Sequence, residues 1–270
     1  MSVSVESPTL HRLTRQEIVS VASRLANTLP DAPADAPRAR RSLPIASLVE
    51  AGARYWRLVL RAQGEEALLD SFRLPGQYTT LQWADLEPRY LVIAEGPSRT
   101  RQGRALEFLL DRDSSLGQAL RGASVGDVVG VSPAEGPGWE LGDLLGCGEV
   151  WAFASGSGIA TMRSVWRELE HQWPERAERF ALFYGEHERD DFVYAHEQRA
   201  LAQRGATVRR AWSAREAQDP GPRFVQQALD RAAPDEGVHV LLSGAPQMIE
   251  AVAEHVLGMG VPPECISLNV

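Results

Sequence analysis

Two patterns of apolar and polar positions divide the chain. In its first half, short runs of alternating character are separated mostly by glycine, proline or aspartate; they cover residues 54–61, 68–74, 77–83, 90–94, 105–110 and 127–131. Many short runs at close spacing predict the strands of an antiparallel barrel or sandwich. One helix, over residues 116–123, is predicted to interrupt them after a capping serine, Ser114 or Ser115.

After Trp139 the pattern changes to apolar strands that alternate with helices. Strands are predicted over residues 150–154, 180–184, 207–211 and 238–242, and helices over residues 160–172, 194–203, 223–232 and 247–259. This alternation predicts a parallel sheet that is covered on both faces. Right-handed crossovers bring the turns after the strands to one edge of that sheet, where ligands bind.

The N-terminal segment differs from both halves. Thr14 and Glu17 form a capping box for a helix that ends at Pro30, and residues 30–37 are a proline- and alanine-rich linker. The predicted organisation is therefore a helix and linker over residues 1–41, a β-barrel domain over 42–142 and an α/β domain over 143–270.

A glycine-rich turn follows the first strand of the α/β pattern. Gly156 and Gly158 lack the Cβ that would block close approach of a ligand, and a helix with one apolar face begins at Ile159. A strand, a bare turn and a helix N-terminus together form an anion site. The glycines read G-x-G-x-x-T, without the third glycine of the dinucleotide fingerprint, so a purely structural turn is an equal alternative.

Composition narrows the function classes. A hydrophobic content of 44% and a charged content of 24% are typical of a globular protein, and a net charge of −8 argues against a nucleic-acid surface. The two cysteines, Cys147 and Cys265, lie too far apart in sequence to encode a zinc site or an iron–sulfur cluster. Neither a membrane-spanning run nor a signal peptide is apparent, so a cytoplasmic location is expected.

Four stretches in order carry a resemblance to a known family. They read R-L-P-G-Q-Y over residues 73–78, G-D-V-V-G-V-S-P over 126–133, A-S-G-S-G-I-A-T-M over 154–162 and S-G-A-P-Q-M over 243–248. From about residue 43 to the end, the chain resembles the ferredoxin–NADP reductase superfamily. Within it, the chain is most similar to a group of plant and bacterial single-chain reductase-like proteins.

The resemblance implies a barrel of the flavin-binding type followed by a Rossmann-like nucleotide domain. It implies an enzyme that passes a hydride from NADPH, or from NADH, to FAD and then passes electrons to an unidentified acceptor. Because the chain has no cysteine cluster, an iron–sulfur centre would lie on a redox partner. The alternative function is a flavin-deficient, non-catalytic relative that binds a nucleotide or a partner.

For the flavin, the family motif R-x-Y-(S/T) falls on Arg89, Tyr90, Leu91 and Val92. Arg89 would bind the pyrophosphate, but Leu91 replaces the aromatic residue and Val92 the hydroxyl. Tyr90 would point to the opposite face of the strand unless a bulge re-aims it. The family's second anchor, a serine, falls on Gly117 close to Ser114 and Ser115, where backbone N–H groups could still hold phosphate.

For the nucleotide, the resemblance assigns a role to each turn of the α/β domain. The turn of Ser155, Gly156, Ser157, Gly158 and Ile159 would hold the pyrophosphate. Ser243 would contact the nicotinamide where many relatives have cysteine, beside Gly244, Pro246 and Met248. Phe224 would form the adenine platform, and Ser213 with Arg215 would bind a 2′-phosphate, near Arg209, Arg210 and Arg223.

Several of these residues have structural alternatives. Glu186 and Glu188 compete with the arginines, because an acidic residue after the second strand would favour NADH. Arg89 fits an ordinary salt bridge, Phe224 a core position and Tyr78 barrel packing equally well or better. His187 is expected to be a loop histidine.

Overall fold

The computed structural model describes residues 40–146, 148–214, 221–229 and 237–269. The helix predicted from Thr14 and nearly all of the linker segment lie outside the described residues, as does Arg215. In the described residues, no helix is long and apolar enough to cross a membrane.

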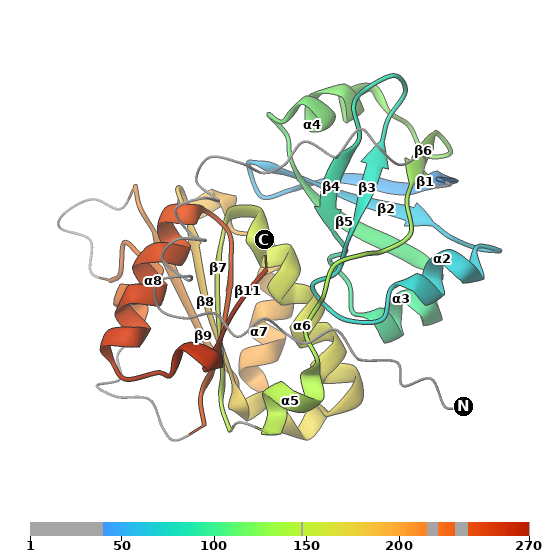
Figure 1. The fold of residues 1–270 in the computed structure, drawn as a ribbon. Coiled ribbons are helices and arrows are strands. Elements are labelled where there is room, and N and C mark those ends of the chain that lie inside the picture. The colour runs from blue at the N-terminus through green and yellow to red at the C-terminus, as the bar shows by residue number, and fades with distance from the viewer. Residues whose placement is uncertain (1–39, 147, 215–220, 230–236, 270) are drawn as a thin grey trace, which may run out of the picture.

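The first half of the chain folds into an antiparallel sheet of six strands in the order β4-β3-β6-β1-β2-β5 (Figure 1). Its core contains the fully buried side chains of Leu58, Leu60, Phe72 and Phe108. The strands are β1 (Arg41–Ala51), β2 (Tyr55–Arg61), β3 (Tyr78–Gln82), β4 (Arg89–Val92), β5 (Ala105–Asp111) and β6 (Val128–Val131). The helices are α2 (Glu66–Ser71), α3 (Pro97–Gly103), α4 (Ser115–Ala119) and the 3₁₀ turn η1 (Leu120–Gly122).

The second half folds into a parallel sheet of five strands in the order β11-β10-β7-β8-β9, so the strand before the glycine turn is central. The strands are β7 (Val150–Ser155), β8 (Phe180–Glu186), β9 (Thr207–Trp212), β10 (His239–Ser243) and β11 (Ile266–Leu268). The helices are α5 (Leu141–Gly146), α6 (Ile159–Gln172), α7 (Ala195–Gln203) and α8 (Pro246–Gly258). Short 3₁₀ turns are η2 (Gly156–Gly158), η3 (Pro174–Arg179), η4 (Arg189–Asp191), η5 (Val225–Ala228) and η6 (Pro263–Cys265).

Both faces of the parallel sheet are covered, as its continuous apolar strands predict. One face packs on α6 and α7 and the other on α8 and η5 (Figure 1). The first of these cores also includes Tyr55, Ala94 and Leu109 from the antiparallel sheet, so the two halves share apolar packing.

Some predicted elements are wrong. Residues 68–74 were expected to be a strand, but they lie mainly in and after α2, because Leu68, Leu69 and Phe72 are all buried and this spacing fits a helical turn. The helix predicted over residues 223–232 is, in its described part, only the 3₁₀ turn η5. No helix or strand was expected at β1, β11, α3 or α5.

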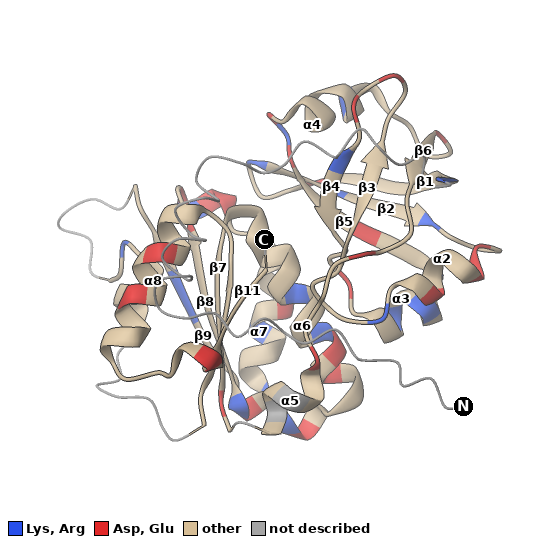
Figure 2. Ribbon diagram, viewed as in Figure 1, with Lys and Arg blue, Asp and Glu red and all other residues tan. Residues whose placement is uncertain are grey.

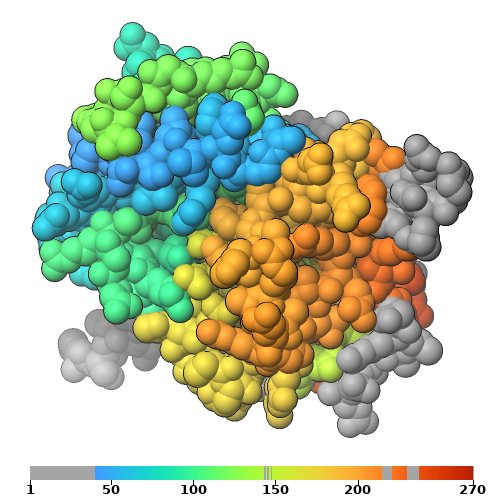
Figure 3. Space-filling model, turned by 180° about the vertical axis from the view of Figure 1, so that it is seen from behind, coloured from blue at the N-terminus to red at the C-terminus, as the bar shows by residue number. Residues whose placement is uncertain are grey.

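The two halves meet first through the turn between β1 and β2, which lies on η4. Gly52 has φ +61°, and a Cβ on it would lie 2.8 Å from the carbonyl oxygen of Asp191. The next residue, Ala53, donates its N–H to the carbonyl of Asp190 at 3.0 Å. Figure 3 shows the blue turn of the first half packed directly on the orange segment of the second half. Glycine is needed here for both its left-handed conformation and the close approach.

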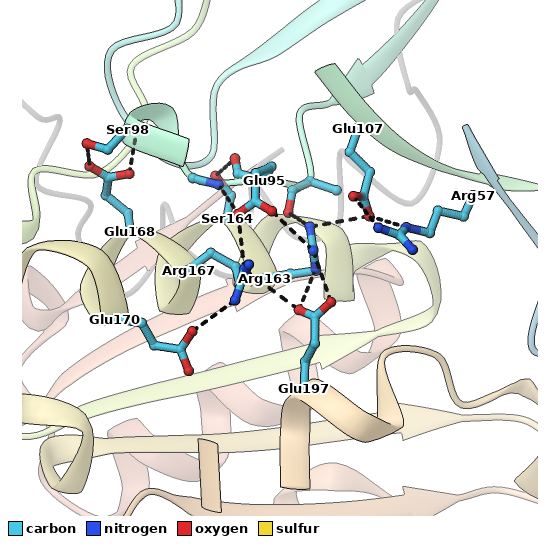
Figure 4. Close-up of polar contacts among 12 residues, drawn as sticks. Arg57, Glu95, Ser98, Glu107, Arg163, Ser164, Arg167, Glu168, Glu170 and Glu197 are labelled. Carbon is cyan, nitrogen blue, oxygen red and sulfur yellow. Dashed lines mark hydrogen bonds and ion pairs between the residues drawn. The ribbon is translucent and has the colours of Figure 1, made fainter. Parts of the chain in front are cut away.

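The second contact is a charge network around Arg163 of α6, whose side chain is buried (Figure 4). Its guanidinium donates to the carbonyl of Ala94 at 2.8 Å and to both carboxylate oxygens of Glu197 at 2.8 and 3.0 Å. Glu95 and Glu107 each lie 3.3 Å away. Burial alone would lower the pKa of Arg163, but the surrounding carboxylates, Glu107 foremost, raise it above its usual value.

Neighbouring residues extend this network along α6. Arg167 contacts Glu95 and Glu170, both at 3.1 Å, and Glu168 accepts the N–H of Ser98 at 2.8 Å and its hydroxyl at 2.6 Å. Figure 2 shows basic and acidic residues interleaved on this helix and beside it. The helix that begins at the glycine turn is therefore fixed to the segment that follows β4.

We expect Arg163→Met to lower the free energy of unfolding by about 3–5 kcal/mol, because three largely buried carboxylates would lose their shared cation. Arg204→Met is the control, since Arg204 contacts Glu170 from a side chain that is 48% exposed and should cost less than about 1 kcal/mol. Urea unfolding measures both. Equal losses in the two variants would contradict a stabilising role for the buried cation.

Candidate functional site

Two turns meet at the carboxyl edge of the parallel sheet, after β7 and after β10. The N–H of Ala245 donates to the hydroxyl of Ser155 at 2.9 Å. A Cβ on Gly158 would overlap the backbone of Ser243, and one on Gly244 would overlap Ser155. These two glycines therefore serve the packing of one turn on the other.

Gly156 is different, because it has φ +58° and an open side. Among the described residues other than its two chain neighbours, only Tyr55 has an atom within 4 Å of a Cβ built there, its hydroxyl oxygen at 3.5 Å. No side chain caps the N-terminus of α6, whose first residue, Ile159, follows Gly158. The turn thus offers a ligand close backbone approach and the positive end of a helix dipole.

Ser243 ends β10 and lies between the two turns. Its hydroxyl donates to Thr161 Oγ1 at 3.0 Å, and the residue is 5% exposed. Pro246 begins α8, and Met248 packs partly on the core beneath that helix. The structure thus brings the predicted nicotinamide turn beside the glycine turn.

A third group lies after β8 and β9, at the same edge. The hydroxyl of Ser213 is 2.9 Å from Nδ1 of His187, and its carbonyl accepts two hydrogen bonds from Arg223, at 2.8 and 3.2 Å. Phe224 follows Arg223 and is 49% exposed, so the interpretation of Phe224 as a core residue is wrong. These residues form a polar surface next to an exposed aromatic ring.

The two arginines of β9 lie on opposite faces, as the alternation of a strand predicts. Arg210 donates to Gln198 of α7 at 2.9 Å, and its guanidinium lies over the ring of Phe192. Arg209 is exposed on the other face. Only Arg209 therefore shares the side of the sheet on which η5 packs.

Glu186, considered as a ribose ligand, instead points into the interface between the two halves. It is 7% exposed and accepts the hydroxyl of Tyr55 at 3.1 and 3.2 Å and that of Tyr184 at 2.5 Å. Glu188, by contrast, has a side chain that is 60% exposed. Of these two acidic residues, only Glu188 is therefore exposed enough to contact the ribose of a nucleotide.

Burial raises the pKa of Glu186 to about 7, against the two tyrosine hydrogen bonds, which lower it. Burial and the charge of Glu186 raise the pKa of Tyr55 and of Tyr184 far above the usual value, so both keep their protons. The sequence analysis did not identify Tyr55, because nothing within residues 54–61 indicates a partner 131 residues away.

On the antiparallel sheet, the ring of Tyr90 packs edge-on against Tyr78, with 5.2 Å between the centroids. Leu91 points the other way and packs on the barrel core, so Val92 lies on the face of Tyr90, and the exposed Arg89 on the face of Leu91. The pairing of β3 with β4 is regular throughout, so no bulge re-aims Tyr90.

At the start of α4, a backbone N–H group is already bound by a side chain of the same segment. The hydroxyl of Ser114 accepts the N–H of Gly117 at 3.0 Å, which identifies Ser114, not Ser115, as the cap. The carbonyl of Gly117 accepts the indole N–H of Trp56 at 3.2 Å. The N–H of Gly117 is therefore taken by Ser114, and the expectation that backbone N–H groups at this helix start hold phosphate stays a prediction. In the described part of the chain, no cluster of histidine, cysteine and acidic residues could hold a metal ion.

We expect stability to fall as pH rises from about 4.5 to about 7, because the folded protein holds the proton of Glu186 more tightly than the unfolded chain does. Glu186→Gln removes this titration. The free energy of unfolding of the variant minus that of the original protein should therefore be larger at pH 8 than at pH 5, by up to about 3 kcal/mol. Urea unfolding at both pH values measures the difference. Glu188→Gln should show no such trend, and a Glu186→Gln difference that is independent of pH would contradict the shifted titration.

Known proteins of similar fold include several reductases. Residues 153–254 match the family model of the oxidoreductase NAD-binding domain. The cytochrome P450 reductase of Amycolatopsis has a TM-score of 0.70 at 20% identity, over 87% of this chain and 72% of that one. A ferredoxin NADP+ reductase of Neisseria gonorrhoeae, with bound FAD and NADP, has a TM-score of 0.67 at 15% identity, over 85% and 97%.

The FAD/NAD-binding domain of nitric oxide dioxygenase from Vibrio cholerae is similar as well, with a TM-score of 0.68 at 18% identity, over 84% of this chain and 97% of that domain. No curated protein sequence matches the chain. The predicted resemblance is confirmed: the chain has the two-domain fold of the ferredoxin–NADP reductase superfamily, with an oxidoreductase NAD-binding domain matched over residues 153–254.

Proposed function

We propose that the protein is a flavin-dependent NAD(P)H oxidoreductase that passes electrons from a nicotinamide nucleotide to a separate acceptor. The observation that carries this proposal is the open side of Gly156, at the end of the central strand and facing the antiparallel sheet. A dinucleotide held there would lie between the two halves, where a flavin on the first half could receive its hydride.

In this proposal each turn of the parallel sheet holds one part of the nucleotide. The turn from Ser155 to Ile159 binds the pyrophosphate through backbone N–H groups. Ser243, Gly244, Pro246 and Met248 border the nicotinamide, while Phe224 stacks on the adenine beside Ser213 and Arg223. No general base is required, because the cofactors carry the redox chemistry and the protein supplies position and electrostatics.

The first half fits FAD only in part. The rings of Tyr78 and Tyr90 share one face of the sheet and offer aromatic surface, and Arg89 is exposed on the same strand. Val92 supplies no hydroxyl, Leu91 is turned to the core, and the N–H of Gly117 is occupied by Ser114. We therefore propose that FAD binds more weakly than in relatives with the full motif. The same observations favour the alternative, a flavin-deficient nucleotide-binding relative.

We further propose that the acceptor is a redox protein that carries its own metal centre. The described residues offer no metal cluster, and the chain has only two cysteines. Two proteins of similar fold are named as a cytochrome P450 reductase and as the ferredoxin reductase in carbazole 1,9a-dioxygenase. The domain boundaries and a cytoplasmic location stay predictions.

Flavin uptake and reduction test the proposed function. We expect the protein to retain added FAD through gel filtration and NADPH to bleach the bound flavin without oxygen. Gly156→Val should keep the flavin and lose its reduction, because the side chain fills the open side of the turn. Gly64→Val is the matched control, since Gly64 also has a positive φ, +86°, and a Cβ there meets nothing. Failure to take up FAD would support the flavin-deficient alternative.

The arginines at the adenosine end should favour NADPH over NADH. We expect Arg223→Ala and Arg215→Ala each to lower kcat/KM for NADPH about tenfold and to leave the value for NADH unchanged, because a charge-assisted phosphate contact is worth about 1.5–3 kcal/mol. Arg210→Ala should leave the NADPH-to-NADH ratio unchanged, because this side chain points toward α7. A higher kcat/KM with NADH in the original protein would contradict the preference.

A further inference from the structure

Tyr55 is a residue of the first half that reaches the glycine turn. Its ring is buried in the core shared with the second half, with 1% of the residue exposed. Its hydroxyl lies 3.5 Å from the point where a Cβ on Gly156 would lie. A ligand atom placed at that point would contact this hydroxyl.

That hydroxyl is held by Glu186. Tyr55 and Tyr184 both place their hydroxyls on the carboxyl group, and Tyr55 lies within 3.2 Å of both of its oxygens. The nearby cation, Arg54, is held by Asp111 at 2.6 and 2.7 Å. The carboxyl group is thus buried between two hydroxyls, while the cation beside it is paired elsewhere.

The proton on Glu186 decides what Tyr55 can offer to a ligand. An ionised carboxylate only accepts hydrogen bonds, so it engages both tyrosine protons, and the oxygen of Tyr55 then faces the turn as an acceptor. A protonated carboxyl group donates one hydrogen bond itself and frees one tyrosine O–H. A pyrophosphate is anionic and accepts hydrogen bonds, so it is complementary to the protonated state and repelled by the ionised one.

We propose that Tyr55 is a positioning residue for the dinucleotide and that binding of the dinucleotide is accompanied by proton uptake at Glu186. This inference rests on the proposed function, because it concerns the same turn. The raised pKa of Glu186, about 7, supports it, since the carboxyl group is then partly ionised at neutral pH and binding can shift its protonation.

Other charged groups around Glu186 do not account for such a dependence. Asp191 of η4 accepts the N–H of Glu188 and repels the ionised form of Glu186, which raises its pKa further. Arg54 stays charged at every relevant pH. His187 is also close in sequence, but its side chain is 65% exposed and contacts Ser213 and Glu188. It is the group that an experiment must separate from Glu186.

Calorimetric titration with NAD+ tests the inference, because NAD+ lacks the 2′-phosphate, which itself titrates near neutral pH. We expect Kd to be about fivefold lower at about pH 6 than at about pH 8, because binding makes Glu186 hold its proton more tightly. Titrations near pH 7 in two buffers of different ionisation enthalpy should show uptake of a fraction of a proton for each NAD+ bound.

Three variants assign the proton. Glu186→Gln should bind with the same Kd at both pH values and without proton uptake, while His187→Gln should behave as the original protein does. Tyr55→Phe keeps the buried ring, and thermal unfolding checks that its fold is intact. This variant should lose most of the gain in affinity at the lower pH.

The outcomes separate this inference from the proposed function. A pH-independent Kd in the original protein, or an unchanged pH dependence in Glu186→Gln, would overturn the inference and leave the function standing. Loss of the dependence in His187→Gln alone would also overturn it. If neither NAD+ nor NADP+ binds at both of these pH values, the proposed function and the inference are overturned together.

Discussion

The buried guanidinium of Arg163 is the interaction on which the arrangement of the two halves depends. A cation removed from water is stable only when its partners are equally well placed, and Glu95, Glu107 and Glu197 supply them from three different segments. The chain contains no lysine, so each of its 28 basic side chains is an arginine. A planar guanidinium can donate to several oxygens at fixed angles, which a lysine ammonium does less well.

Arg163 is close in sequence to the glycine-rich turn, so the network also fixes the position of that turn. It lies on α6 one turn after the glycine-rich segment, and the same helix carries Ser164 and Arg167, which contact the segment after β4. The glycine turn and the tyrosine-bearing face of the antiparallel sheet are thus joined through one rigid helix. In the proposed function the electron-transfer site is assembled from both halves and needs such a connection, because a small misplacement of reacting groups costs rate.

Local patterns in the sequence predicted the parts of the structure that local forces determine. The strand, turn and helix around Gly156 were predictable, since the apolar run and the glycines act within a few residues. The alternation of β4 likewise separated Tyr90 from Leu91 correctly. By contrast, residues 68–74 were ambiguous, because a short apolar run satisfies a strand and a buried helical turn equally well.

The contacts that sequence reasoning missed all join distant segments. Tyr55 and Glu186 are in contact only because the two sheets pack on each other. No pattern near either residue in the sequence indicates that contact. The capping of Gly117 by Ser114 was predictable in principle, because a capping serine takes the third N–H of its helix. Because Ser114 takes this N–H, a phosphate at the start of α4 would need the other backbone N–H groups there, and that role stays a prediction.

The contacts that join the halves differ in strength from one side of the interface to the other. Arg163 joins them through several charged hydrogen bonds, whereas the turn at Gly52 holds through one backbone hydrogen bond and close packing. Breaking this second attachment, together with the hydrogen bonds of Tyr55 to Glu186, costs less than separating the charges around Arg163, so we expect the halves to part first on that side. The bare backbone of Gly156 lies on that side of the interface, next to the hydroxyl of Tyr55.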